Sequence, residues 1–274
     1  MTGRTIIITG ASDGIGAAAA RALSGNGDTI VLVGRSPQKT KAIADELGAP
    51  YHLADFARLD DVRELAATLL ATYPRIDVLA NNAGGIMAAR ELTVDGFEKT
   101  MQVNHLAPFL LTNLLMTRLV ESGATVIGTA SIANILYGKI DVDDIQNARK
   151  YSPNKAYGDA KLANILFAKE LDARFRAHGI RSASFHPGVI ATNFAAESSS
   201  VLRFVYRTVL SRFLGTAETG ADTLVWLASS HPDTHWPLGE YFSKRRVAKA
   251  NAQAYEAGLS SRLWDASAAM VGIS

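Results

Sequence analysis

Tyr157 and Lys161 stand four residues apart in a stretch whose apolar positions repeat with helical spacing. On a helix, this spacing puts the phenol and the ammonium on one face, within reach of the same ligand. A phenol with a reference pKa of about 10 is a poor base at neutral pH, but a nearby ammonium stabilises the phenolate. Such a pair can give a proton to a carbonyl oxygen or take one from an alcohol.

A second tyrosine and lysine with the same spacing, Tyr151 and Lys155, come just before this pair. Pro153 lies between them and disfavours a helical conformation at Ser152. Their side chains are therefore not expected to share a helical face, and Tyr157 is the tyrosine we expect to transfer the proton.

Ser131 follows the apolar run 125–129, at a place where a strand is expected to end. Ligands of open α/β sheets lie at the carboxyl ends of the strands, so its hydroxyl could hydrogen-bond a substrate oxygen. A nucleophilic role is not indicated, because the flanking residues lack the G-x-S-x-G pattern and no matching His–acid pair is visible.

A glycine-rich turn follows the first apolar run, where residues 9–16 read TGASDGIG. A strand, a glycine turn and a helix N-terminus in this order direct free N–H groups and the helix dipole toward a pyrophosphate. The spacing is G-x-x-x-G-x-G rather than the commoner G-x-G-x-x-G. Taken alone, the turn indicates either dinucleotide binding or an ordinary strand–helix connection.

The second apolar run ends in VLVGRS and carries no carboxylate. At this place an acidic residue holds the ribose 2′-hydroxyl of NAD, whereas an arginine accommodates the 2′-phosphate of NADP. Arg35 therefore predicts NADP(H), with NAD(H) as the alternative. Two observations weigh against this: Asp13 puts a negative charge in the glycine turn, and Arg35 could be a solvated surface residue.

Short β-branched runs alternate with stretches of helical periodicity along the chain. Near-continuous apolar strands indicate burial on both faces, hence a parallel sheet covered by helices, the doubly wound α/β (Rossmann) fold. The expected strands are Thr5–Thr9, Thr29–Val33, Tyr51–Ala54, Asp77–Ala80, Thr125–Thr129 and Ser182–Phe185, and the clearest helices are Ala17–Leu23, Lys39–Leu47 and Val62–Thr72.

No repeat or linker divides the chain, so we predict a single domain over residues 1–274. Two segments fall outside the alternation. Residues 132–156 are expected to be a loop-rich insertion. Residues 193–215 contain an amphipathic stretch that either covers the core or, as our functional hypothesis, forms a lid selecting lipophilic substrates.

The composition of the chain excludes several classes of function. With a net charge of +2, no blocks of basic residues and no cysteine, the chain matches neither a nucleic-acid binder nor a thiolate-based or disulfide-bonded protein. We expect neither a signal peptide nor a transmembrane segment, and hence a cytoplasmic protein without membrane-surface contact. His231 and His235 are separated by Pro232, so we predict no metal site. His105 and His186 are interpreted as structural or supporting residues.

In combination, these motifs resemble the short-chain dehydrogenase/reductase family from end to end. The glycine turn is joined by Asn-Asn-Ala-Gly at 81–84, and the catalytic tetrad of the family resembles Asn104, Ser131, Tyr157 and Lys161. The resemblance implies about seven strands, a site between the first and fourth strands, a Lys161 that also holds the nicotinamide ribose, and an Asn104 that supports a proton relay. The predicted cofactor-binding residues are Gly10, Ser12, Asp13, Gly14, Ile15, Gly16, Arg35, Asp55, Phe56, Asn82, Ala83, Gly84, Tyr157, Lys161, Pro187, Gly188, Val189 and Thr192.

Within the family, the chain is similar to the retinol dehydrogenase and protochlorophyllide reductase branch. The stretches VNHL at 103–106, KLANILF at 161–167 and HPGV at 186–189 carry this similarity, whereas Ala160 departs from the serine usual before the lysine. The implied activity is reversible hydride transfer between NADP(H) and a small-molecule carbonyl or alcohol, expected to be lipophilic, with Tyr157 as acid and base. A non-catalytic NADP-sensing module and an epimerase or dehydratase that retains its nicotinamide are the alternatives. A homo-oligomer is left open.

Overall fold

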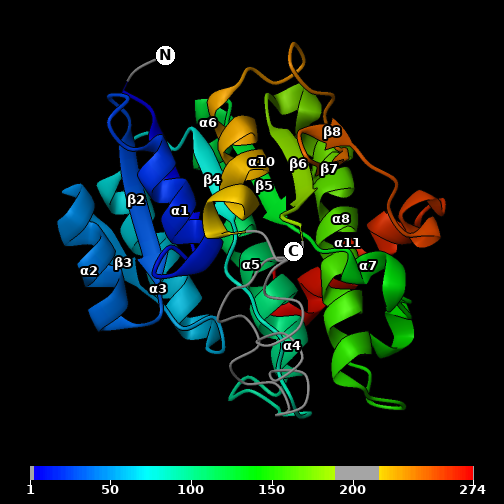
Figure 1. Cartoon of the computed structure of the whole chain (residues 1–274). Coiled ribbons are helices and arrows are strands. Elements are labelled where there is room, and N and C mark those ends of the chain that lie inside the picture. The colour runs from blue at the N-terminus through cyan, green and yellow to red at the C-terminus, as the bar shows by residue number, and fades with distance from the viewer. Residues whose placement is uncertain (1–2, 189–215, 274) are drawn as a thin grey trace.

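One sheet of eight strands runs through the computed structural model, which describes residues 3–188 and 216–273 (Figure 1). The strand order is β3-β2-β1-β4-β5-β6-β7-β8, and neighbours pair in parallel except for β7 and β8. The order reverses between β1 and β4, which opens the crevice where such sheets bind ligands. The strands are β1 (Thr5–Thr9), β2 (Thr29–Gly34), β3 (Tyr51–Leu53), β4 (Val78–Asn81), β5 (Thr125–Thr129), β6 (Arg181–His186), β7 (Tyr241–Ser243) and β8 (Arg246–Val247).

Helices cover both faces of this sheet. Figure 1 shows α1 and α10 in front of it, and their apolar residues form one core cluster with Ile6 and Ile8 of β1. Ile7 points to the opposite face, into the core formed with α3, α5, α8 and α11. The described helices are α1 (Gly14–Leu23), α2 (Pro37–Leu47), α3 (Leu59–Thr72), α4 (Lys99–Met101), the π-helix η1 (Gln102–Leu106), α5 (Ala107–Leu114), α6 (Met116–Ser122), α7 (Ala133–Leu136), η2 (Val142–Asp144), α8 (Pro153–Phe175), η3 (Arg176–His178), α10 (Ala217–Ser229), η5 (Ala252–Tyr255) and α11 (Leu259–Val271).

The start of α8 separates the two tyrosine–lysine pairs. Ser152 caps the helix by accepting a hydrogen bond from Lys155 N, and Pro153 occupies the first turn, where its missing N–H costs nothing. Tyr151 lies before the cap and donates to Ala89 O at 3.2 Å, whereas Tyr157 is inside the helix. The expectation that Tyr151 and Lys155 do not share a helical face is confirmed.

The predicted parallel sheet is confirmed, with two differences in detail. Seven strands are parallel, and β8 adds a short antiparallel edge, because the turn at Lys244 and Arg245 folds the chain back on β7. Within the predicted insertion 132–156, α7 and η2 form short helices and α8 already begins at Pro153. The predicted lid at 193–215 lies outside the described residues. Among the described helices, none is both long and apolar enough to cross a bilayer.

Candidate functional site

The glycine turn packs tightly against the loop that follows β4. Gly10 has a φ of +67°, and a Cβ there would lie 2.8 Å from Ala83 Cα. A Cβ on Gly16 would lie 2.2 Å from Gly10 O. Asp13 caps α1 by accepting a hydrogen bond from Gly14 N at 2.8 Å. Side chains are thus excluded where the strand, the turn and the helix meet, and the N-terminus of α1 faces the crevice.

Asn82 connects the strands on either side of the crevice. Its Nδ2 donates to Thr9 O at 3.0 Å, and its backbone N donates to Thr9 Oγ1 at 3.0 Å. Thr129 Oγ1, at the end of β5, donates to Asn82 Oδ1 at 3.3 Å. The Asn-Asn-Ala-Gly motif therefore holds the ends of β1, β4 and β5 in place.

Two exposed cations lie where β2 ends. Arg35 follows Gly34, which contacts Ser12 of the glycine turn so closely that a Cβ would lie 3.1 Å from Ser12 Cβ. Lys39, in the first turn of α2, forms an exposed ion pair with Asp13 at 2.8 Å. Lys39 was missed by the sequence analysis, although its position four residues after Arg35, at the start of a predicted helix, was a signal.

Asp55 and Phe56 follow β3, beside this end of the sheet. Asp55 is partly exposed, and its carboxylate accepts a hydrogen bond from Ala57 N at 3.0 Å. The side chain of Phe56 is buried in the core, and its carbonyl accepts a hydrogen bond from Gln102 Nε2 at 3.3 Å. Ile15 is partly buried against the core around α1.

Lys161 is a buried cation on α8, with 1% of its surface exposed. Its Nζ donates to Thr129 O at 3.1 Å and lies 5.4 Å from the centroid of the Tyr157 ring. Burial disfavours the charged form and lowers the pKa of Lys161 to about 7. The phenol and the ammonium thus lie together on one side of α8.

Asn104 belongs to the π-helix η1, whose widened turn lets its side chain reach the loop after β4. Its Nδ2 donates to Gly85 O and Thr100 O, both at 2.8 Å, and its Oδ1 accepts from Gly85 N at 3.0 Å. A Cβ on Gly84 would lie 2.4 Å from Asn104 Oδ1 and 3.1 Å from Lys161 Nζ. The structure therefore brings Asn104 and Lys161 together around Gly84.

Ser131 lies two residues beyond β5 and is partly buried. Its Oγ accepts a hydrogen bond from Ala133 N at 3.2 Å, and its carbonyl accepts from Asn134 Nδ2 at 2.6 Å. Asn134 is held in turn by Asn251 N, which donates to its Oδ1 at 2.9 Å. The C-terminal segment thus supports the loop that carries Ser131.

The loop after β6 begins with Pro187 and Gly188. Gly188 has a φ of +91°, and its N donates to His186 Nδ1 at 3.3 Å. Burial lowers the pKa of His186. Val189 and Thr192, which the sequence analysis assigned to the cofactor, lie outside the described residues.

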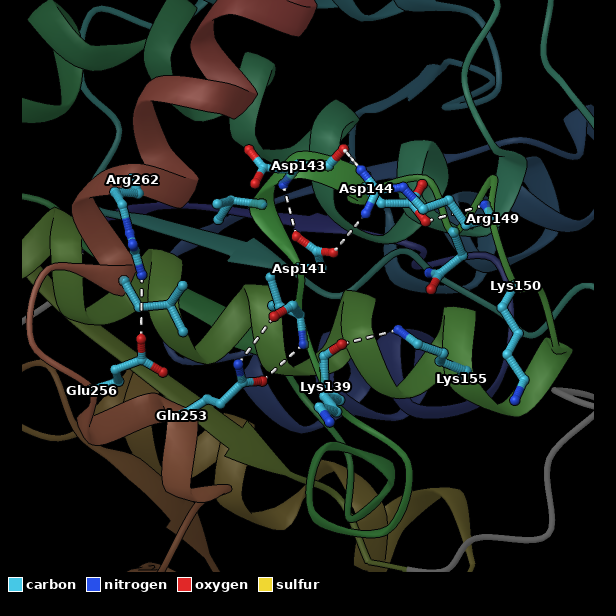
Figure 2. Close-up of a pocket in the computed structure, with 14 residues that line it drawn as sticks. Lys139, Asp141, Asp143, Asp144, Arg149, Lys150, Lys155, Gln253, Glu256 and Arg262 are labelled. Carbon is cyan, nitrogen blue, oxygen red and sulfur yellow. Dashed lines mark hydrogen bonds and ion pairs between the residues drawn. The ribbon is translucent and has the colours of Figure 1, made fainter.

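A separate hollow of about 530 Å³ opens between the 139–150 segment, α8 and the C-terminal segment (Figure 2). Its charged side chains largely bind one another: Arg262 donates to Glu256 at 3.2 Å, and Arg149 donates to Asp141 at 3.4 Å. Gln253 bonds both the N–H and the carbonyl of Ile140. None of the predicted catalytic residues lines the hollow. We therefore interpret it as a structural contact region between the 139–150 segment and the C-terminal segment.

Comparisons with known proteins agree with this arrangement. The short chain dehydrogenase family model matches residues 4–202. A Streptomyces sp. (strain C5) protein, named as a candidate daunorubicin C-13 ketoreductase (DnrU), is 44% identical over 99% of this chain and 94% of its own length. Retinol dehydrogenase 14 of Mus musculus is 34% identical over 100% of this chain and 87% of its own length.

Solved structures show the same fold. An uncharacterised protein from Mycobacterium paratuberculosis superposes with a TM-score of 0.80, at 31% identity over 99% of this chain and 94% of that one. A candidate NAD(P)-dependent gluconate 5-dehydrogenase from Beutenbergia cavernae, with NADP bound at low occupancy, gives 0.66 at 27% identity, over 84% and 90%. The chain belongs to the short-chain dehydrogenase/reductase family of oxidoreductases, in its retinol dehydrogenase-like branch.

Proposed function

We propose that this chain uses NADP(H) to interconvert a lipophilic carbonyl compound and its alcohol, with Tyr157 as proton donor and acceptor. The observation that carries the proposal is the buried ammonium of Lys161, 5.4 Å from the Tyr157 ring centroid and beside the crevice between β1 and β4. Burying a cation costs free energy, so its retention beside a phenol supports a chemical role.

The residues along the crevice fit a nicotinamide dinucleotide. The glycine turn excludes side chains at the N-terminus of α1, which favours a pyrophosphate there. Arg35 and Lys39 supply positive charge where a 2′-phosphate would lie, which supports NADP(H) over NAD(H). Asp55, the 82–84 loop, Lys161 and the loop that begins at Pro187 would hold the remaining parts. When bound, the nicotinamide supplies or accepts the hydride.

Side chains of this protein carry out the proton transfer. In reduction, Tyr157 donates the phenolic proton to the carbonyl oxygen as that oxygen gains negative charge, while the Ser131 hydroxyl orients the same oxygen. The Lys161 ammonium stabilises the resulting phenolate. Asn104, bonded to Gly85 and Thr100, supports the path by which the proton returns. Oxidation of an alcohol follows the same steps in reverse.

A lipophilic substrate is supported by side chains beside Ser131. Ile135, Leu136 and Tyr137 form a run of exposed apolar residues on α7 and just after it, with Leu136 61% exposed. Apolar surface of this kind, close to a catalytic residue, favours binding of an apolar molecule. The names of two relatives specify retinol and daunorubicin, both much larger than short-chain alcohols.

A cytoplasmic location stays a prediction from the sequence.

A cofactor-consumption screen tests this proposal. The purified protein is supplied with NADPH or NADH and with aldehydes and ketones of graded size and polarity, and absorbance at the nicotinamide band is followed. We expect turnover with NADPH on the larger apolar carbonyls and a lower kcat/KM with NADH. Tight binding of NADPH without turnover of any carbonyl would contradict the proposal and favour a cofactor-sensing protein.

A further inference from the structure

Three buried polar side chains lie together inside the apolar layer between the sheet and α11. They are His105 of η1, Asn164 of α8 and Ser267 of α11, with exposed fractions of 1%, 7% and 0%. Aromatic rings surround the first of them: His105 lies 5.9 Å from Phe109 and 6.3 Å from Phe167, measured between ring centroids. Buried polar groups are costly without hydrogen bonds, so the bonds that these side chains do make are needed to keep them buried.

Asn164 shares one acceptor with Lys161. Thr129 O accepts a hydrogen bond from Lys161 Nζ at 3.1 Å and another from Asn164 Nδ2 at 3.0 Å. Asn164 lies one helical turn after Lys161, so both donors approach the carbonyl from the same face of α8. The position and the remaining acceptor strength of the Thr129 carbonyl at the end of β5 therefore depend on Asn164.

His105 is held by the C-terminal helix. Its Nε2 lies 2.9 Å from Ser267 Oγ of α11. Burial lowers the pKa of His105 to about 4, so the imidazole is neutral at physiological pH. His105 directly follows Asn104 in η1, and anchoring its ring to α11 also anchors the backbone that carries Asn104.

We infer that Asn164, His105 and Ser267 are positioning residues. Asn164 holds the Thr129 carbonyl that fixes Lys161, and the contact between His105 and Ser267 ties η1 to α11 and thereby holds Asn104 in place. The inference rests on the proposed function and extends it to residues that touch neither substrate nor cofactor. Without the Asn164 donor, the Thr129 carbonyl is free to bind the ammonium more strongly. Lys161 is then drawn toward β5 and away from Tyr157.

The decisive experiment titrates Lys161 by NMR in protein labelled with ¹³C at lysine Cε, the signal being assigned by its loss in Lys161→Arg. Among the described residues, the phenol of Tyr157 faces Lys161, with its ring centroid 5.4 Å from Lys161 Nζ. We expect Asn164→Ala to raise the midpoint of Lys161 by about half a pH unit or more, because the freed carbonyl stabilises the ammonium. This readout requires no turnover, so it tests the inference even if the proposed function fails.

Steady-state kinetics of the variants provide a second test. Asn164→Ala is expected to lower kcat about 10-fold while the KM for NADPH changes less than about twofold, since the loss falls on the chemical step. Ser267→Ala should lower kcat about threefold, and Ser267→Thr, which keeps the hydroxyl, should restore it. If Asn164→Ala does not fold, the two Ser267 variants decide the question.

Ser182→Ala is the matched control. Ser182 is also fully buried, and its Oγ donates to Ala168 O of the same helix α8 at 2.7 Å, away from Thr129. It should lower the melting temperature without changing kcat or the Lys161 midpoint. The inference is overturned if Asn164→Ala and Ser267→Ala lower only the melting temperature, as Ser182→Ala does.

Discussion

The two ends of the candidate site are built in different ways. The glycine-turn end consists of backbone and small residues, with its charges exposed on Arg35, Lys39 and Asp13. At the Tyr157 end, the side chains of Asn104, Tyr157 and Lys161 are buried, and the Lys161 cation is fixed by a strand-end carbonyl. A site of the first kind depends on backbone shape, whereas one of the second kind depends on a buried network whose charge is costly to keep.

The difference predicts how each end responds to change. At the Tyr157 end, a single side chain should decide turnover and should also alter the pH dependence of stability. At the glycine-turn end, only a substitution that clashes with the backbone should cause a large loss of stability or cofactor binding. Substitution of an exposed charge should change the affinity for NADPH by a small, salt-dependent amount.

The largest effect is expected from Tyr157→Phe, which removes the phenolic proton and leaves the ring. Loss of acid–base catalysis should lower kcat by about 10² to 10⁴. The KM for NADPH and the melting temperature should stay near those of the wild type, because the ring still fills its place. Single-turnover kinetics with NADPH measure this, and a variant with near-normal turnover would remove Tyr157 from the mechanism.

Lys161→Met should abolish turnover but stabilise the fold at neutral pH. Burial lowers the pKa of Lys161 from 10.5 to about 7, so between these values the unfolded chain binds the extra proton. The free energy of unfolding therefore rises with pH between about 7 and 10.5. Below pH 7, the full cost of burying the protonated lysine destabilises the folded state. A neutral methionine removes the penalty, so its gain of about 1 to 3 kcal/mol at pH 6.5 should fade toward pH 10.

Urea unfolding at both pH values measures this gain. Lys41→Met is the control, because Lys41 is exposed on α2 and its replacement should change stability by less than about 0.5 kcal/mol at either pH. A gain of equal size at pH 6.5 and pH 10 would mean that burial of the charge is not its cause.

Sequence patterns identified the parallel sheet and paired Tyr157 with Lys161, because strand periodicity and helical spacing are local properties. Asn104 was assigned only by the resemblance to the family. They did not reveal that Thr129 O holds Lys161, since backbone carbonyls look alike in every sequence. Lys39 was missed for a related reason: its ion pair with Asp13 joins the N-terminal ends of α1 and α2, which are 26 residues apart in the sequence. Contacts between distant segments become visible only when the strand order is known.

Gly10→Ala tests the glycine-turn end. The new Cβ would lie 2.8 Å from Ala83 Cα, so the turn or the 82–84 loop must shift. We expect the free energy of unfolding to fall by about 2 to 3 kcal/mol and NADPH binding to be lost. Gly25→Ala is the matched control: Gly25 also has a positive φ, of +83°, but its Cβ would meet nothing within 4 Å. Equal effects from the two variants would show that strain, and not the close approach, is responsible.

Smaller effects are expected from the exposed cations. Arg35→Ala should raise the KM for NADPH about 10-fold and leave that for NADH nearly unchanged, since a charge-assisted bond to a phosphate contributes about 1.5 to 3 kcal/mol. Lys39→Ala should also raise the KM for NADPH. Steady-state kinetics with both cofactors at fixed ionic strength measure this, and an unchanged cofactor preference in both variants would refute the assignment of NADP(H).

The smallest effect is expected from Asp13→Asn. The asparagine still caps α1 through Gly14 N, but it no longer holds Lys39 in an ion pair. Because the pair is exposed, releasing Lys39 should tighten NADPH binding only about twofold, and added salt should erase the gain. Glu46→Gln, which breaks the exposed Arg21–Glu46 pair on the same two helices, should leave NADPH affinity unchanged. Weaker binding in Asp13→Asn would mean that the carboxylate itself contributes to holding the cofactor, and that this end of the site is not tuned by phosphate attraction alone.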